Sequence, residues 1–104
     1  MATWKAVERK VAAILGGERV PITGRARGSA PDIAHDTLSI EVKHRKSLPG
    51  WLHDAMDQAL KSMKKGQRPV VILHEKGQKY EDCYCIVRLS DFIKGDTIDR
   101  EPIQ

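Results

Sequence analysis

Apolar residues recur at helical spacing in two stretches of the chain. In residues 3–15 they fall three or four positions apart, and Gly16-Gly17 follows, as at the C-terminal end of a helix. The second stretch runs from Trp51 to about Lys64, and Gly66 follows it. Both patterns predict amphipathic helices. Their apolar positions are Trp4, Val7, Val11, Ile14 and Leu15 in the first helix and Leu52, Ala55, Met56, Ala59 and Met63 in the second.

Other apolar segments have the pattern of strands. Residues 38–43 alternate strictly between apolar and polar side chains, and residues 32–34 would form the other half of a hairpin that turns at residues 35–37. The continuous apolar run at residues 69–74 favours a strand that is covered on both faces. Further elements are expected as strands at residues 19–22 and 84–89 and as a short last helix that Ser90 caps and that ends at Gly95.

These elements follow one another in the order α-β-β-β-α-β-β-α, which predicts an α/β sandwich with a mixed sheet. A chain of 104 residues without repeats or a linker is expected to form one domain over residues 1–104. Its 40% apolar and 31% charged residues are ordinary for a globular protein. The sequence contains no apolar stretch of membrane-spanning length and no signal-peptide pattern, so we expect a soluble cytoplasmic protein.

The charge balance changes this picture only mildly. A net charge of +4 and a pI of about 9.2 suit a polyanionic partner without proving one. Aromatic residues make up only 5% of the chain, which argues against a surface for stacking single-stranded bases. Cys83 and Cys85 are not expected to bind zinc, because no second pair exists to complete a structural zinc site. They are expected to be small buried residues instead.

Two acids and a lysine lie on the predicted hairpin. Glu41 and Lys43 are two positions apart and therefore share one face of their strand. Asp32 joins that face if the turn is two or four residues wide, but not if it is three residues wide without a bulge. Clustered carboxylates suit Mg²⁺ or Mn²⁺. The alternative interpretation is a set of solvated charges on an exposed strand face, since both motifs are short and common.

Each predicted helix adds one polar residue beside its apolar stripe. Glu8 lies on the flank of the first stripe and is therefore expected to turn partly inward, where an unpaired acid is costly. It would be a third carboxylate beside a metal, or it would form a surface pair with Lys5 or Arg9. Gln58 lies beside the second stripe. It would reach a lysine, a water or a phosphate, or it is an ordinary polar residue at the edge of a helix.

Taken in order, these residues resemble the PD-(D/E)XK nuclease superfamily over roughly residues 4–75. The small size and the run GGERVP…GRARGSAPDI…LSIEVKHRKSLPGW are most similar to archaeal-type and phage Holliday-junction resolvases. The resemblance implies a restriction-endonuclease-like fold, a three-layer-like sandwich with a central mixed β-sheet flanked by helices. Only residues 33–40 separate the two motif acids, so the hairpin must be tight. The matching motifs are Glu8, Pro31-Asp32, Glu41-Val42-Lys43 and Gln58.

The resemblance also implies an activity and a cofactor. The chain would be an Mg²⁺-dependent endodeoxyribonuclease that hydrolyses phosphodiester bonds in branched DNA, with Mn²⁺ able to substitute. Asp32 and Glu41 would bind the metal together with the Val42 carbonyl, and Glu8 would complete or orient the site. The supporting roles would fall to Lys43 as the catalytic lysine, to Gln58 as a polar residue on the second helix, and to a loop hydroxyl of Thr23 or Ser29.

Basic residues flank the motif on both sides and are expected to bind phosphate in a salt-dependent way. No segment has the pattern of a base-reading helix, so recognition of backbone shape is expected. The residues concerned are Arg19, Arg25, Arg27, Ser29, His44, Arg45 and Lys46, whereas the group from Lys61 to Arg68 is equally well explained as a solvated face. By analogy with the resolvases, the chain would act as a homodimer.

Two other functions fit the same residues. One is a different nuclease of this superfamily, acting on flaps, nicking duplexes or taking part in replication and repair. The other is a DNA-binding module without catalytic activity, in which the acids are present by chance.

Overall fold

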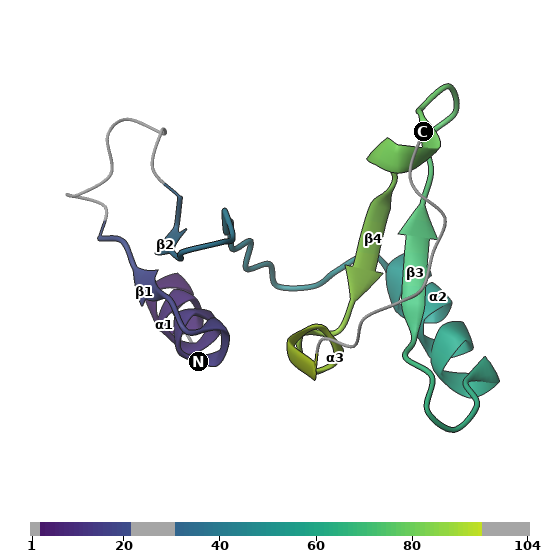
Figure 1. The fold of residues 1–104 in the computed structure, drawn as a ribbon, viewed down its shortest axis with the longest axis horizontal. Coiled ribbons are helices and arrows are strands. Elements are labelled where there is room, and N and C mark those ends of the chain that lie inside the picture. The colour runs from purple at the N-terminus through teal and green to yellow at the C-terminus, as the bar shows by residue number, and fades with distance from the viewer. Residues whose placement is uncertain (1–2, 22–30, 95–104) are drawn as a thin grey trace. The chain divides into compact units, whose positions relative to one another are not determined.

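The computed structural model describes residues 3–21 and 31–94. The chain divides into two compact units, Met1–Lys46 and Ser47–Gln104, which we describe separately. The described residues contain three α-helices and two antiparallel sheets of two strands each (Figure 1). The predicted mixture of helices and strands is therefore confirmed. None of the described helices combines the length and the apolarity needed to cross a membrane.

The first unit begins with helix α1 (Trp4–Leu15), where the periodicity predicts it. The hydroxyl of Thr3 accepts the backbone N–H of Ala6 at 3.1 Å, which caps the N-terminus of the helix. The helix ends at Gly16, whose φ of 75° lies in the left-handed region that favours glycine. The predicted glycine stop is thus confirmed, and the chain reverses there.

Strands β1 (Glu18–Arg19) and β2 (Ile33–Ala34) pair antiparallel directly after this reversal, with Arg19 opposite Ile33. Gly17 permits the close approach of the two segments. A Cβ atom at that position would lie 2.5 Å from the carbonyl oxygen of Ala34. Ile33 is completely buried, and it also forms a single antiparallel bridge with Ile40.

The strand expected at residues 38–43 is not formed beyond that bridge, so this prediction is wrong. The side chain of Asp32, rather than a backbone carbonyl, accepts the N–H of Val42 at 2.7 Å. Pro31 directly precedes Asp32 in the chain and is the next residue that could pair with the segment after Ile40. As a proline it has no backbone N–H to donate to a ladder. Pairing therefore stops after Ile40, and the segment that carries Glu41 continues as irregular chain.

The turn between the two paired segments is held by His35, which the sequence offers no reason to single out. Its Nδ1 accepts the backbone N–H groups of Thr37 at 3.1 Å and Leu38 at 3.2 Å. Because backbone N–H groups can only donate, the ring proton lies on Nε2, which donates to the Leu15 carbonyl at 2.9 Å. His35 thus joins the turn to the end of α1.

The second unit places one helix beside a β-hairpin. Strands β3 (Val70–Leu73) and β4 (Tyr84–Val87) are antiparallel, with Val71 opposite Ile86, and helix α2 (Gly50–Ser62) packs against β3 (Figure 1). Helix α2 begins directly after Pro49. Ser90 lies inside the last helix, so the prediction that it caps that helix is wrong. The elements are α2 (Gly50–Ser62), β3 (Val70–Leu73), a 3₁₀ turn at Tyr80–Asp82, β4 (Tyr84–Val87) and α3 (Leu89–Lys94).

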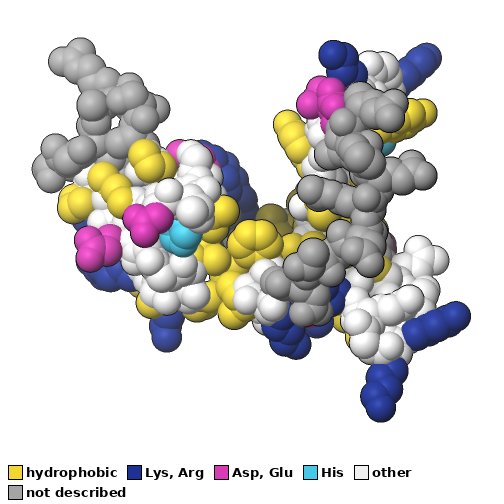
Figure 2. Space-filling view, viewed as in Figure 1, with side chains coloured by type: hydrophobic (Ala, Val, Ile, Leu, Met, Phe, Trp, Pro, Cys, Tyr) yellow, Lys and Arg dark blue, Asp and Glu magenta, His cyan; other side chains and the backbone are white. Residues whose placement is uncertain are grey.

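Few aliphatic side chains are buried in either unit. Among the described residues they are Ala12 and Ile33 in the first unit and Val71 in the second. On the opposite face of β3 from Val71, Val70 is 40% and Ile72 is 58% exposed, so the expected covering of both faces is not observed. Cys85 is also exposed, contrary to expectation. Hydrophobic side chains are visible at the surface of both units (Figure 2).

A buried carboxylate ties α3 to the end of β4. The Nε of Arg88 donates to Oδ2 of Asp91 at 2.8 Å, and Arg68 donates to the Asp91 carbonyl at 3.4 Å. The hydrogen bond from Arg88 lowers the pKa of Asp91 below its ordinary value of 3.8, against the opposite effect of burial. The ionised carboxylate therefore stabilises the fold above its ordinary pKa, and this contribution is lost as the pH falls through the folded-state pKa.

We predict that Asp91→Asn weakens the acid dependence of stability. The wild-type chain should lose unfolding free energy below about pH 4, the range in which an ordinary aspartate becomes protonated, and the variant should lose less. Urea denaturation at a series of pH values from neutral to acidic measures this. Asp54→Asn, at an exposed position on α2, is the control and should keep the wild-type slope. Equal slopes for wild type and Asp91→Asn would contradict the prediction.

Candidate functional site

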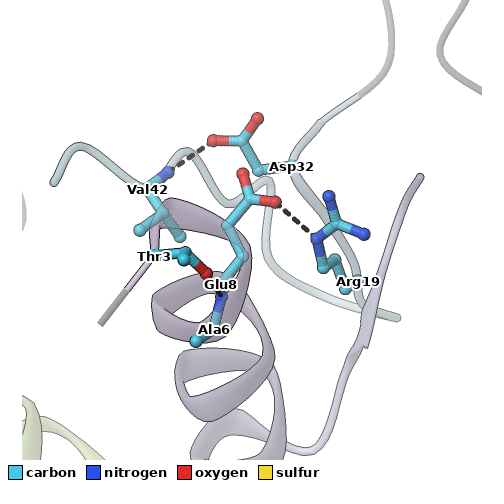
Figure 3. Close-up of polar contacts among 6 residues, drawn as sticks. All are labelled: Thr3, Ala6, Glu8, Arg19, Asp32 and Val42. Atoms are coloured by element: carbon cyan, nitrogen blue, oxygen red, sulfur yellow. Dashed lines mark hydrogen bonds and ion pairs between the residues drawn. The ribbon is translucent and has the colours of Figure 1, made fainter. Parts of the chain in front are cut away.

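Two buried carboxylates lie in the first unit. Glu8 projects from α1 and is 4% exposed, and Asp32 precedes β2 and is 9% exposed. The Val20 N–H donates to the backbone carbonyl of Asp32 at 2.9 Å, which continues the β1–β2 pairing and holds Asp32 beside the end of β1. Glu8 extends from the helix toward the segment that carries Asp32 (Figure 3). We call Glu8, Arg19, Asp32 and Val42 the Glu8–Asp32 cluster.

Glu8 is paired with a cation of β1. The Nε of Arg19 donates to Oε1 of Glu8 at 2.8 Å, and the two side chains are 13% and 6% exposed (Figure 3). The guanidinium carbon lies 5.3 Å from the centre of the Trp4 ring, within the range of a cation–π interaction. The inward orientation of Glu8 is therefore confirmed. Neither of the expected surface partners on α1 makes this ion pair, which is formed by Arg19 instead.

Asp32 is held by the backbone of the irregular segment that carries the motif residues Glu41, Val42 and Lys43. The Val42 N–H donates to Oδ2 at 2.7 Å, a short charge-assisted hydrogen bond (Figure 3). The N–H that Asp32 accepts belongs to the peptide group between Glu41 and Val42, whereas the predicted ligand is the carbonyl of the next peptide group. The structure thus brings Asp32 and Val42 together through the Val42 N–H and not through the carbonyl that was predicted as a ligand.

Glu41 and Lys43 are both exposed. The bridge between Ile33 and Ile40 has the register of a four-residue turn, in which Asp32 would oppose Glu41 if the ladder continued by one pair. It does not continue. Across residues 3–21 and 31–94, no three acidic, histidine or cysteine side chains are grouped as a metal site would need. The third predicted acid is thus not gathered with the other two.

The other predicted site residues have varied positions. Gln58 is exposed on α2 in the second unit. Its backbone carbonyl accepts a hydrogen bond from the Ser62 hydroxyl at 2.9 Å. Most of the Arg19 side chain is buried against Glu8, so it is less accessible to DNA than expected. The exposed basic residues after the motif are His44, Arg45 and Lys46, and the predictions for Thr23, Arg25, Arg27 and Ser29 fall outside the described residues.

The Glu8–Asp32 cluster offers a divalent cation two carboxylates, which is fewer than the three ligating side chains that were sought among the described residues. Carboxylate and peptide oxygens are the ligands that Mg²⁺ prefers. In the observed arrangement, however, Oε1 of Glu8 accepts from Arg19 and Oδ2 of Asp32 accepts from Val42. A cation that used these two oxygens would therefore have to replace protein donors.

Comparisons with protein-family models, with curated proteins and with solved structures found no match for this chain. The resemblance to the nuclease superfamily therefore depends on the motif residues themselves.

Proposed function

We propose that this chain is a metal-dependent, structure-selective endodeoxyribonuclease that hydrolyses phosphodiester bonds in branched DNA, with the four-way junction as its preferred substrate. The observation that carries the proposal is the burial of Glu8 and Asp32, from two separate elements, in one small unit. Burying carboxylates is costly, and a small domain retains them where they have a role. Their order along the chain is also that of the nuclease motif.

The proposed roles follow the motif residue by residue. Asp32, Glu41 and the Val42 carbonyl would hold the cation, with Glu8 completing the site. When bound, Mg²⁺ would polarise the scissile phosphate and supply a water for in-line attack. Lys43 would stabilise the negative charge that develops on the phosphate oxygens.

These roles require the pairing of β2 to extend one step beyond Ile40, which would bring Glu41 opposite Asp32 with Lys43 on the same face. The proposed fold is a three-layer-like sandwich with a central mixed β-sheet flanked by helices.

DNA binding would use the exposed basic residues that follow the motif, His44, Arg45 and Lys46, through contacts to phosphate. We propose a homodimer, because a four-way junction presents two symmetric strands for cleavage. Exposed Tyr84 and Phe92, at 71% and 47%, provide apolar surface for such a contact.

A DNA-binding module without catalytic activity is the second candidate. The observation that favours it is the state of the acids, since Glu8 is already neutralised by Arg19 and Glu41 is exposed. Such a module would bind branched DNA through the same basic residues but would lack a cation site.

Cleavage assays on labelled four-way junctions, flaps, duplexes and single strands distinguish these functions. We expect paired symmetric nicks in the junction with Mg²⁺ or Mn²⁺ and none with chelator. Cleavage of flaps or duplexes would indicate another nuclease of the same superfamily. Binding without cleavage under either metal would contradict the enzymatic proposal and favour the second candidate. Binding should weaken steeply as the salt concentration rises, because phosphate contacts release counterions.

A further inference from the structure

We propose that two copies of this chain associate through their second units, with Lys64 and Lys65 of each copy bound at an aromatic cavity of the other. This inference rests on the proposed function, because it names the contact surface of the proposed homodimer. In each contact, the ammonium group of a lysine meets aromatic rings and a carboxylate.

The first surface is a cavity of about 600 Å³ between the N-terminal end of α2 and the β3–β4 hairpin, which we call the aromatic cavity. Trp51 from α2 and Tyr84 from β4 line it, and both are exposed. Glu75, which follows β3, adds an exposed carboxylate. Ring faces and a carboxylate both attract an ammonium group. The other lining residues are Ile72, Leu73, His74 and Gln78, so the lining contains no lysine or arginine of its own.

The other tryptophan of the chain already binds cations in this way. The Nζ of Lys5 lies 5.5 Å from the centre of the Trp4 ring, and the guanidinium carbon of Arg19 lies 5.3 Å from it. Among the described residues, the cation–π contacts are those over Trp4. The ring of Trp51 therefore remains available to a cation from another molecule.

The second surface is the turn after α2, where the chain is strongly basic. No acidic residue occurs between Gln58 and His74. The Lys64 carbonyl accepts the N–H of Gln67 at 3.0 Å, and Oε1 of Gln67 accepts the N–H of Lys64 at 2.9 Å, so the turn is held in one conformation. Lys64 and Lys65 are exposed on it. The basic residues of this segment are Lys61, Lys64, Lys65 and Arg68.

The two surfaces lie at opposite ends of β3 and do not meet within one copy. The turn after α2 leads into one end of β3, and the loop of the hairpin leaves the other end (Figure 1). Along α2, Trp51 and Lys61 are about 15 Å apart, and Lys64 and Lys65 come after Lys61. This distance exceeds the length of a lysine side chain, so the lysine that occupies the aromatic cavity has to come from another molecule.

A second copy supplies that lysine when the β3 strands of the two copies run antiparallel. A two-fold axis then brings the turn of each copy to the aromatic cavity of the other, and the same contact forms twice. Exposed Val70 and Ile72 of β3 lie between the two ends and would form an apolar centre. Opposite charges at the rim of an apolar centre are typical of protein interfaces.

Reversing the charges tests the proposal in the full chain without DNA. Sedimentation equilibrium at low ionic strength measures the dissociation constant of the dimer. Glu75→Lys places like charges opposite each other and should raise that constant at least about tenfold, as should the variant that combines Lys64→Glu with Lys65→Glu. Joining all three substitutions restores opposite charges and should return the constant to within about threefold of wild type.

The matched controls reverse one charge elsewhere on the surface. Glu81→Lys changes an exposed acid of the hairpin loop that does not line the aromatic cavity, and Lys10→Glu changes an exposed lysine of α1. Each should alter the dissociation constant less than about twofold, because salt and water screen distant surface charges. All the substituted residues are exposed, so the variants should fold like wild type.

The outcomes separate this inference from the proposed function. Loss of the dimer in both charge-reversed variants and its return in the combined variant support the inference. A dimer that persists in every variant, a wild-type monomer, or a combined variant that stays monomeric shows that these surfaces do not meet. Weaker junction binding by Lys64→Glu with Lys65→Glu, at an unchanged dimer constant, would assign the lysines to DNA and also overturn the inference. Junction cleavage by the wild type with Mg²⁺ decides the proposed function independently of these results.

Discussion

Glu41→Gln should lower the rate of junction cleavage by at least about 100-fold, the scale at which loss of one group that stabilises a transition state is felt. Glutamine keeps the shape of the side chain but removes the charge that a cation requires. Junction binding should stay within about twofold of wild type, because phosphate contacts come from the basic residues rather than from Glu41. Single-turnover cleavage with Mg²⁺ measures the rate, and gel-shift titration in chelator measures binding.

The matched control for this substitution is Glu18→Gln, which removes one exposed carboxylate from β1 in the same unit. Its cleavage rate should remain close to that of wild type. Lys43→Ala should behave like Glu41→Gln, since both residues belong to the proposed catalytic motif. A near wild-type rate for Glu41→Gln would mean that this carboxylate does not hold the cation, whatever the activity of the chain.

The helices could be predicted because their signals are local. The spacing of Trp4, Val7 and Val11 and the stop at Gly16 depend only on neighbours within a few positions, and α1 follows them closely. Residues 38–43 show the limit of such patterns. Alternation indicates which way side chains would face, but it does not reveal that the Asp32 carboxylate takes the N–H of Val42. A side chain that replaces a backbone acceptor ends the ladder without changing the pattern.

In the candidate site, too, the features that depend on neighbouring residues could be predicted from the sequence, whereas the contacts between distant segments could not. The position of Glu8 beside the apolar stripe correctly predicts that it turns inward. Its partner was not predictable, because the neighbours along α1 are Lys5 and Arg9, whereas Arg19 arrives from β1 after the chain reverses at the glycines. The link between His35 and Leu15 has the same origin. Contacts that depend on a reversal of the chain leave little trace in local spacing.

Ile33→Ala should lower the unfolding free energy of the first unit by about 2–5 kcal/mol, the usual cost of truncating a fully buried isoleucine. The side chain is 0% exposed and belongs to the strand segment between β1 and Ile40. Urea denaturation measures the change, followed by Trp4 fluorescence in the Trp51→Phe background so that the signal comes from α1. Ile33→Val removes only one methylene group and should cost about 0.5–1.5 kcal/mol.

Ile72→Ala is the matched control, because it makes the same truncation in a strand at a position that is 58% exposed. It should cost less than about 1 kcal/mol, the span of strand preferences at exposed positions. Equal losses for the two substitutions would mean that Ile33 is not the anchor of the first unit. Asp32 directly precedes Ile33, so a loosened β2 also loosens the hydrogen bond between Asp32 and Val42. Ile33→Ala should therefore weaken Mn²⁺ binding as well, even though no atom of its side chain can bind a cation.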